Sequence, residues 1–466
     1  MTRFLLPGRF PSMKIEQFLS LEEGKTLEFK ENSLSSQNIA KTIIAFSNTA
    51  GGILILGVQD ADKKVIGIEN PIKEVERIAN IINDCISPKI APNIDVISYR
   101  NKNLVQVQIY PGANKPYYLK SAGLPKGAYY RIGSTNREAD HTMIEELKRS
   151  VTYEFFDETP MLDLNPEEVD FRVASGFFKN KKVLSKRDLQ TLELIVTNQG
   201  KQVPSVGGVI LFSPRREKFF PDCWIQAGRF LGTTKSEIMD SVEIHDYPIN
   251  SIERGTDFVK KHSMLAYKIE GLQRTEHWSV PIKAVREALI NAYAHMDYSQ
   301  AGAPIRISIF DDRLEIENPG LLPFGLTIND IIEGVSKIRN KVIVRVLHEL
   351  GYIERWGLGI NRIMESCTHA GLPLPEFKEI ANRFRVTIFT KRVESLKQDK
   401  IDQEIIEFIK ASEGLSTTEV ATKVGLSARA VRERLKNLVD LDLLYVVSTG
   451  PYDPYKKFKA RANQLK

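Results

Sequence analysis

AFSNTAGGILILGVQD, residues 45–60, contains the end of a predicted helix, a glycine turn and a predicted strand. A helix is predicted to run into it, because apolar residues recur at spacings of four and three. These residues are Ile39, Ile43 and Phe46. Gly51 and Gly52 end the helix, since glycine is common just past a helix C-terminus. Residues 53–58 form an apolar run rich in β-branched side chains, which indicates a buried central strand. A helix followed by a buried strand predicts a mixed α/β unit.

This α/β unit extends over residues 14–150. A second helix is predicted at 72–84, and a strand at 104–110, where apolar and polar side chains alternate. The unit closes with GAYYRIGSTNREAD and a helix at 141–150.

Residues 160–275 carry no motif with recognisable chemistry, and we interpret them as an α/β scaffold. GGVILF (207–212) and WIQAGRFLG (224–232) predict two strands. Residues 249–269 predict a helix.

Residues 280–390 predict an α/β sandwich with helices on one face of a sheet. A helix at 280–298 is followed by strands at 304–310 and 314–320. The polar, glycine-containing stretch 320–340 is long for an ordinary loop, which favours a lid or ligand-covering segment.

The end of the chain, residues 401–460, follows a charged linker at 391–400 and shows the order of a winged helix. Three predicted helices precede a strand pair; Gly425 lies in the turn before the third helix and Ser427 caps that helix. Basic side chains lie chiefly on the outer surface of the third helix and in the wing: Arg429, Arg432, Arg434, Lys436 and Lys456. The pattern resembles winged-helix domains, which implies contact with DNA or RNA. Dimerisation or docking to a protein is the alternative.

Composition agrees with several globular domains. The chain has 466 residues and a net charge of +6, too long for one hydrophobic core. Residues 391–466 hold 15 Lys and Arg against 11 Asp and Glu, so +4 of that charge lies there. Three scattered cysteines argue against a disulfide framework and a structural zinc site. No apolar run reaches the ~18 residues of a membrane span, and we expect a cytoplasmic protein.

Two motifs in residues 280–390 suit a bound nucleotide. Glu287 and Asn291 are four residues apart and share one helix face. A carboxylate can polarise water, and an amide oxygen can coordinate Mg²⁺. Gly357 and Gly359, at a loop-to-helix junction, would let backbone amides approach a phosphate.

Together these motifs resemble the divergent histidine-kinase/gyrase-type ATP-binding domain of a family of transcriptional regulators. Its members are often labelled as related to an ATP-dependent DNA helicase. The matching segments are REALINAYAHMDYS (286–299), DDRLEIENPGLLP (311–323), SKIRN (336–340) and RWGLGINRI (355–363). The resemblance implies that Glu287 is a general base, that Asn291 is a metal ligand, and that Gly357 and Gly359 belong to the nucleotide lid.

The same resemblance implies that ATP and Mg²⁺ are cofactors. Further cofactor contacts are expected from Asn318, Gly320, Arg339 and Asn340. One motif departs from the family pattern: ENPG (317–320) stands where D-x-G-x-G, whose Asp binds the adenine amino group, is usual. His295 and Asp297 also match, without an assigned role. No G-x-x-x-x-G-K-[ST] phosphate loop is present, so the motor of a helicase is missing.

The N-terminal unit resembles the AlbA-like domain shared with Schlafen proteins. The match rests on AFSNTAGGILILGVQD, on TLEFKEN before it and on KGAYYRIGS after it. The resemblance implies nucleic-acid binding or, as in some Schlafen proteins, metal-dependent RNA cleavage by three carboxylates. Glu23, Glu28 and Asp60 would then be both the catalytic acids and the metal ligands, because clustered carboxylates hold the divalent ions that activate water.

Basic and aromatic residues of this unit predict a nucleic-acid surface. Lys30 shares a strand face with Glu28, and further phosphate contacts are expected from Lys120, Lys126 and Arg131. Tyr129 and Tyr130 would stack on bases, although alternation puts one of the two in the core.

Three hypotheses follow from the sequence. The first is a DNA-binding transcriptional regulator, expected as a homodimer, whose state depends on bound nucleotide. The second is a metal-dependent nuclease gated by the ATP-binding-like domain, and a weak ATPase activity belongs to the same enzymatic alternative. The third is a non-catalytic interaction scaffold.

Overall fold

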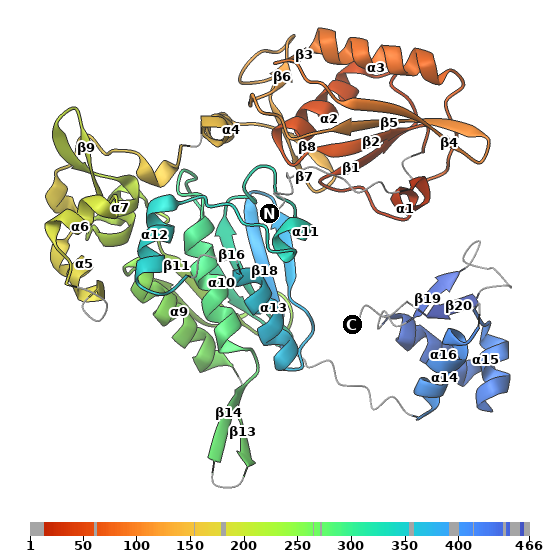
Figure 1. Ribbon diagram of the computed structural model, residues 1–466. Coiled ribbons are helices and arrows are strands. Elements are labelled where there is room, and N and C mark those ends of the chain that lie inside the picture. The colour runs from red at the N-terminus through yellow and green to blue at the C-terminus, as the bar shows by residue number, and fades with distance from the viewer. Residues whose placement is uncertain are drawn as a thin grey trace, which may run out of the picture. The chain divides into compact units, whose positions relative to one another are not determined.

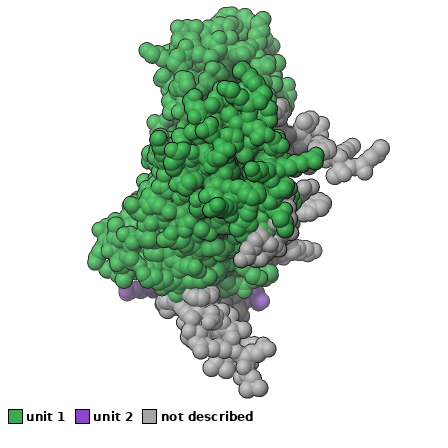
Figure 2. All heavy atoms as spheres, turned by 90° about the vertical axis from the view of Figure 1, so that its left-hand side faces the viewer, with its two compact units in different colours: residues 1–390 green, residues 391–466 purple. Residues whose placement is uncertain are grey.

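The computed structural model describes the greater part of the chain. The described residues are 14–59, 63–152, 154–178, 183–263, 265–270, 273–353, 358–390, 400–412, 414–440, 444–447 and 457–460. They belong to two compact units, 1–390 and 391–466 (Figure 2). The mixed α/β fold class predicted from the sequence is confirmed. The domain boundaries within the first unit stay predictions.

A four-stranded sheet forms the N-terminal part, in the order β1 (Leu27–Lys30), β2 (Gly52–Leu56), β5 (Lys102–Ile109) and β4 (Asn93–Tyr99). Strands β1 and β2 are parallel, and the other pairs are antiparallel. Helices α2 (Ser36–Asn48) and α3 (Pro71–Cys85) pack with Leu54 and Leu56. Helix α1 (Ile15–Leu19) packs with Ile53 and Ile55, on the opposite face. Strand β2 is therefore buried on both faces, which explains its continuous apolar run.

Gly51 makes the turn between α2 and β2 and has a φ of +79°. A Cβ there would lie 2.7 Å from the carbonyl oxygen of Ile109, so only glycine fits. The rest of the unit contains two short strand pairs and a helix. These are β3 (Ile86–Ser87) with β6 (Tyr118–Leu119), β7 (Tyr129–Ile132) with β8 (Thr135–Glu138), and α4 (His141–Thr152).

The region between residues 155 and 220 is mainly helical. It contains η1 (Phe156–Glu158), η2 (Pro166–Glu168), α5 (Phe171–Phe178), α6 (Lys186–Thr191), β9 (Ile195–Asn198), β10 (Lys201–Pro204), α7 (Val206–Phe212) and α8 (Arg216–Phe219). The strand predicted for GGVILF is wrong, because these residues lie in helix α7. All seven residues of α7 are buried, so the sequence has no polar face to reveal the helical period. Ser205 caps the helix by accepting from the Gly208 N–H at 3.0 Å.

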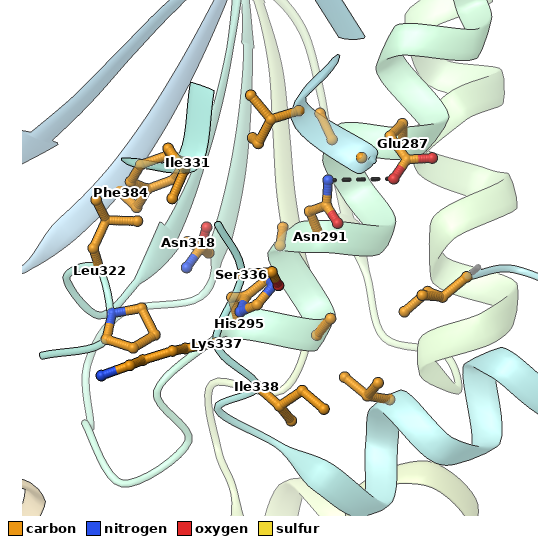
Figure 3. Close-up of a pocket in the computed structure, with 18 of the residues that line it drawn as sticks. Glu287, Asn291, His295, Asn318, Leu322, Ile331, Ser336, Lys337, Ile338 and Phe384 are labelled. Atoms are coloured by element: carbon orange, nitrogen blue, oxygen red, sulfur yellow. Dashed lines mark hydrogen bonds between the residues drawn. The ribbon is translucent and has the colours of Figure 1, made fainter. Parts of the chain in front are cut away.

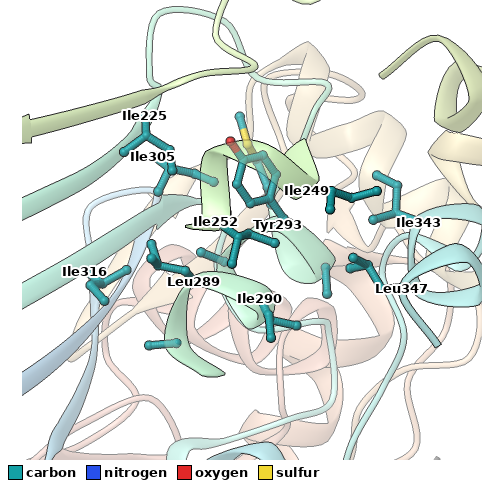
Figure 4. Close-up of a cluster of buried hydrophobic side chains, with 14 of the residues drawn as sticks. Ile225, Ile249, Ile252, Leu289, Ile290, Tyr293, Ile305, Ile316, Ile343 and Leu347 are labelled. Atoms are coloured by element: carbon teal, nitrogen blue, oxygen red, sulfur yellow. The ribbon is translucent and has the colours of Figure 1, made fainter. Parts of the chain in front are cut away.

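A six-stranded sheet forms the central part of the first unit (Figure 1). Its order is β12 (Ile238–Ile244), β11 (Ile225–Phe230), β15 (Ile305–Ile309), β16 (Arg313–Pro319), β18 (Arg383–Phe389) and β17 (Glu376–Ile380). Helices α9 (Pro248–His262), α10 (Ile282–His295) and α13 (Gly359–His369) lie over one face, as the sandwich prediction requires. Their contact with the sheet is a continuous apolar core that includes Ile225, Ile252, Leu289, Tyr293 and Ile316 (Figure 4).

The helix predicted over 249–269 is too long. Helix α9 ends at His262, and residues 265–270 form β13 (Leu265–Glu270), which pairs with β14 (Gln273–Trp278). Helices α11 (Ile328–Ile332) and α12 (Lys341–Glu349) complete the first unit. Among the described residues, no helix is long and apolar enough to cross a membrane.

The second unit has the element order of a winged helix. It consists of α14 (Lys400–Lys410), α15 (Thr417–Val424), α16 (Ala428–Asp440), β19 (Leu444–Val447) and β20 (Lys457–Ala460). Gly425 ends α15 with a φ of +69°, and the Ser427 hydroxyl accepts from the Ala430 N–H at 3.3 Å. Val431, Leu435 and Leu438 of α16 are buried, as their spacing predicts.

Candidate functional site

A cavity of about 480 Å³ lies between helix α10, the segment 320–340 and the sheet (Figure 3). The segment predicted as a lid supplies much of its wall: Leu321, Leu322, Pro323, Leu326, Ile331, Val335, Ser336, Lys337 and Ile338. Strand residues Ile316, Phe384 and Val386 line the sheet side. Apolar residues therefore form the greater part of the cavity wall, as is usual for small-molecule sites, and polar side chains form the rest.

Helix α10 presents three polar side chains to the cavity, at successive positions four residues apart. Glu287, Asn291 and His295 all line it (Figure 3). The Asn291 Nδ2 donates to Glu287 Oε1 at 3.4 Å, and Asn291 Oδ1 has no hydrogen bond within the described part of the chain. The guanidinium of Arg362 approaches Glu287 to 4.0 Å. The structure thus brings together the predicted base and the predicted metal ligand, and leaves an amide oxygen for a cation.

Helix α13 begins at Gly359, against these two residues. A Cβ on Gly359 would lie 2.5 Å from Glu287 Oε1 and 2.8 Å from Asn291 Nδ2, so a larger residue there would displace these two side chains. Leu358, Gly359 and Ile360 line the cavity, so the N-terminus of this helix lies at its wall. Such an end favours negative charge. Gly357 lies outside the described residues.

Asn318 and Gly320, in the ENPG motif, also line the cavity. Gly320 has a φ of +100°, and a Cβ there would overlap the guanidinium of Arg339.

Arg339 and Asn340 are not among the residues that line the cavity, and their predicted cofactor contacts stay predictions. Asn340 is 1% exposed and its Nδ2 donates to the carbonyls of Ala294 and Met296. Arg339 donates to Glu146 and to the Leu321 carbonyl. Both side chains hold the lid segment in place.

Basic side chains that the sequence did not single out lie at the cavity wall. They are Lys337, Lys341, Arg345 and Arg362. Lys337 donates to the Phe324 carbonyl at 2.7 Å, and burial lowers the pKa of its ammonium group. Its place inside 320–340 and its place inside the matching segment SKIRN (336–340) were the signals that the sequence offered.

The lid segment also contacts the N-terminal part of the first unit. The Gly325 N–H donates to the Thr49 carbonyl at 3.1 Å. The Lys115 ammonium lies 4.9 Å from the centre of the Phe324 ring and 3.5 Å from the Thr49 carbonyl oxygen. Burial lowers the pKa of Lys115 to about 7, and the charge of Lys337 contributes. One wall of the cavity is therefore also a contact with α2 and its following turn.

Charged and apolar groups extend this contact. Arg339 pairs with Glu146 of α4 at 2.8 Å, and burial raises the pKa of that carboxyl to about 6. Glu379 binds Lys25 at 2.6 Å and accepts from the Leu322 N–H at 2.8 Å. Leu321 and Phe324 are buried with Tyr130, Ala128, Ala139, Met143, Ile144 and Leu147.

The predicted nuclease acids have structural partners. Glu28 is 5% exposed and pairs with Lys30 at 2.7 Å and with Arg131. Glu23 accepts from the Phe29 N–H at 2.7 Å. Asp60 lies outside the described residues, and within them no group of three His, Cys, Asp or Glu side chains could hold a metal ion. The two described acids therefore hold the start of the sheet together, and no observation of them favours metal-dependent cleavage.

Arg131 is fully buried, so its predicted place on a phosphate-binding surface is wrong. Its guanidinium donates to the carbonyl of Gly24 at 2.8 Å and to Asn136 at 2.9 Å, besides pairing with Glu28. It also lies 4.7 Å from the Phe46 ring centre. The side chain ties β7 to β1 and α2.

The remaining residues of the predicted surface behave differently. Lys120 and Lys126 are exposed, and Lys30 is half-buried beside Glu28. Tyr130 is 6% exposed and donates to Asn382, whereas Tyr129 is partly exposed. The alternation argument is thus confirmed, with Tyr130 as the core residue.

In the second unit, Arg429, Arg432 and Lys436 are exposed on α16. Arg434 is partly buried and pairs with Asp402 at 2.7 Å. Lys456 lies outside the described residues. The outer face of α16 therefore carries the three basic side chains predicted for nucleic acid.

Three family models match separate parts of the chain. Residues 23–140 match the Schlafen, AlbA_2 model, and residues 302–388 match "Putative ATP-dependent DNA helicase recG C-terminal". Residues 398–444 match the model for winged helix-turn-helix DNA-binding domains. The three resemblances are confirmed. The second match begins after α10, so Glu287, Asn291 and His295 lie outside it.

A curated relative, an uncharacterized ATP-binding protein of Ureaplasma parvum, is 38% identical over 78 residues. The match covers 16% of this chain and 22% of that protein, so the chain spans only a small part of this relative's length.

Two solved structures are also similar. A protein from Corynebacterium diphtheriae matches with a TM-score of 0.43 and 18% identity, over 91% of each chain. The N-terminal domain of a RecG-related protein from Nitrosomonas europaea matches with a TM-score of 0.22 and 28% identity, over 27% of this chain and 92% of that one.

Proposed function

We propose that this chain is a nucleic-acid-binding transcriptional regulator whose affinity for nucleic acid depends on ATP and Mg²⁺ held in the cavity beside α10. The observation that carries the proposal is the double role of the segment 320–340. The segment lines the cavity and, through Gly325, Phe324 and Leu321, packs against the N-terminal part of the same unit.

The residues of the cavity suit a nucleotide. Apolar side chains can enclose a base, while the N-terminus of α13 and the basic side chains Lys341 and Arg362 suit phosphates. Asn291 has an amide oxygen free of hydrogen bonds within the described residues, which suits Mg²⁺ as a ligand. Glu287 beside it could hold a water molecule, so weak hydrolysis is part of this proposal. The ATP-binding relative supports adenine nucleotide as the ligand.

A ligand can shift the protein between states only if it binds those states with different affinity. In this proposal the two states differ in the position of the lid segment. Because the segment lines the cavity, the two states then bind the ligand with different affinity. Movement of Leu321 or Phe324 would disturb the apolar cluster with Tyr130 and Met143. It would also disturb the Arg339–Glu146 pair, so both ends of the contact respond together.

Nucleic-acid contact is proposed for two surfaces. One is the exposed basic face of α16, with Arg429, Arg432 and Lys436. The other is the N-terminal surface with Lys120 and Lys126. A homodimer that binds paired half-sites and a cytoplasmic location stay predictions.

The test is a titration of the full chain into labelled duplex DNA, single-stranded DNA and structured RNA, followed by fluorescence anisotropy. Each titration is done with Mg²⁺, with and without ATP. The proposal predicts binding of at least one nucleic acid and a change of its affinity with ATP of about fivefold or more. Absence of binding contradicts the nucleic-acid part, and binding without any effect of ATP contradicts the coupling.

Phe324→Ala tests the route of the coupling, since Phe324 contacts Lys115 without lining the cavity. The variant should keep its affinity for ATP and lose most of the ATP effect on nucleic acid. Leu374→Ala, at a side chain that is 60% exposed, is the control and should keep the full effect. An undiminished ATP effect in Phe324→Ala shows that the segment does not carry the coupling.

A further inference from the structure

The six-stranded sheet has a second face, opposite to the helices α9, α10 and α13 (Figure 1). Side chains alternate along a strand, so the sequence neighbours of the buried core residues point to this second face. On β15 such a neighbour is Arg306, on β16 it is Glu317, and on β18 it is Arg385. The strand register places Arg306 opposite Glu317, and Glu317 opposite Arg385. A charged row therefore crosses three adjacent strands of this face.

Glu317, in the middle of the row, is surrounded by cations. Its carboxylate binds Arg385 at 2.6 Å through one oxygen and Arg383 at 3.1 Å through the other. The ammonium group of Lys235, in the connection between β12 and β11, lies 4.0 Å from the carboxylate. Burial opposes the negative charge of Glu317, but these three cations hold its pKa below the ordinary value. Both oxygens of the carboxylate are therefore already engaged in ion pairs.

Arg306 is left without a counter-ion. Although Glu317 is its cross-strand neighbour, the Arg306 side chain has no hydrogen bond or ion pair among the described residues, and its Nε–H is buried there without an acceptor. Burial lowers the pKa of Arg383, and against Glu317 the charge of Arg306 contributes to the lowering. Arg313 does not alter the balance, because it pairs with Glu315 at 2.7 Å. Four cations around one carboxylate thus leave an excess of three positive charges.

The shape of this surface suits a polymer better than a small anion. Arg306 and Arg385 lie on strands separated by β16, so their backbones are about 10 Å apart at about 4.8 Å between neighbouring strands. Lys235 is 44% exposed, and Gln226, the neighbour of Arg306 on β11, is exposed as well. A guanidinium group can bind a phosphate through two parallel hydrogen bonds. Several such groups on an open sheet can contact successive phosphates of one strand.

We propose that this face of the sheet binds the phosphate backbone of DNA, in addition to the two surfaces named above. The inference rests on the proposed binding of nucleic acid, and the match of residues 398–444 to winged helix-turn-helix DNA-binding domains makes duplex DNA the polymer. Phosphate contacts position a duplex without reading its sequence. Arg383 and Arg385 are held by Glu317, whereas Arg306 has no partner among the described residues and Lys235 is only distantly paired. Arg306 and Lys235 should therefore contribute most to the affinity.

The experiment measures how the affinity of the full chain for labelled duplex DNA depends on salt, by fluorescence anisotropy. The double variant Arg306→Gln with Lys235→Gln should bind about tenfold more weakly at about 0.1 M salt, and the slope of log affinity against log salt should fall by about 2. Lys235→Gln alone, at an exposed position, should lower the slope by about 1. The control is Arg187→Gln, at an exposed arginine of α6, and should keep the slope. Thermal unfolding shows that each variant is folded.

The outcomes separate this inference from the proposed function. An unchanged slope in the folded double variant and in Lys235→Gln overturns the inference, while DNA binding by the unsubstituted chain leaves the proposed function intact. An equal loss per charge in Arg187→Gln also overturns it, because the effect would then follow net charge and not this face. Absence of DNA binding by the unsubstituted chain overturns the inference and contradicts the proposed contact with duplex DNA as well.

Photocrosslinking locates the DNA directly. A benzoylphenylalanine in place of Gln226, beside Arg306 in the sheet, should crosslink to labelled duplex DNA under ultraviolet light. The crosslink should be lost when Arg306→Gln and Lys235→Gln are added. The same group in place of Arg187 is the control and should give no crosslink. Bound DNA that crosslinks at neither position, or equally at both, contradicts the assignment of this face.

Discussion

Replacing Arg131 by methionine tests whether this residue and Glu28 are structural. The guanidinium is fully buried, and it donates to two backbone carbonyls, to Asn136 and to Glu28. Methionine has a similar length and leaves these acceptors without their donor. Within the described part of the chain, Glu28, which is 5% exposed, then keeps only the ion pair with Lys30.

The expected cost follows from the burial of the pair. Removing one partner of a buried ion pair destabilises a protein by about 3–5 kcal/mol, because the other charge stays in an apolar environment. A domain is stable by about 5–15 kcal/mol, so Arg131→Met should remove a large part of the stability of the N-terminal sheet. Replacing Glu28 by methionine as well removes the isolated carboxylate, and the double variant should be more stable than Arg131→Met alone.

Amide hydrogen exchange of the full chain measures the stability of the N-terminal sheet locally. The measured quantity is the exchange free energy of the β2 amides at 52–56. The control is Arg137→Met. Arg137 is exposed and lies on β8, which pairs with the strand of Arg131, β7. This substitution should change the exchange free energy of the β2 amides by less than about 0.5 kcal/mol. The reasoning is refuted if Arg131→Met is as stable as the control. If Arg131→Met lost nucleic-acid binding without losing stability, Arg131 would instead be a nucleic-acid contact, as the sequence predicted.

Three further predictions concern the cavity, the folded state and the winged helix. Gly359→Ala places a methyl group 2.5 Å from Glu287 Oε1 and should weaken ATP binding about tenfold, measured by equilibrium dialysis; unchanged affinity would contradict the assigned site. Burial raises the pKa of Asp157 from 3.8 to about 7, so the folded state favours its protonated form and the stability from this group is lost as pH rises through that range. Asp157→Asn should flatten the fall in unfolding temperature between these pH values, and an equally steep fall would rule out Asp157 as its source. Arg429→Ala combined with Arg432→Ala should weaken duplex binding and lower the slope of log affinity against log salt by about 2. An unchanged slope would exclude these two side chains from phosphate contact.

Periodicity predicts the elements of the fold wherever one face is polar. Helices α2 and α16 follow from regular apolar spacing, and β5 follows from alternation. Helix α7 is buried all round and therefore looks like a strand in the sequence. Helix α9 ends at His262, although the prediction extends it to 269. The prediction is too long because nothing in the local pattern marks the change from helix to β13.

The candidate site could be predicted where its residues share one element. Glu287 and Asn291 follow from a spacing of four on a single helix. Arg131 looks like a surface cation in the sequence, although Phe46 and Glu28 enclose it from elements far along the chain. Lys115 and Phe324 are more than 200 positions apart, so their contact becomes visible only in the folded chain. Local pattern thus identifies the groups of one element, and tertiary packing decides which of them are accessible.

The central claim is that nucleotide and nucleic acid affect each other's binding. Calorimetric titration of ATP with Mg²⁺ into the full chain, first free and then saturated with its nucleic acid, tests it most directly. Linkage requires the ATP affinity to change by the same factor by which ATP changes the affinity for nucleic acid, which is typically about 5–150-fold. Matching factors are the predicted result, and an ATP affinity identical in both titrations would contradict the account.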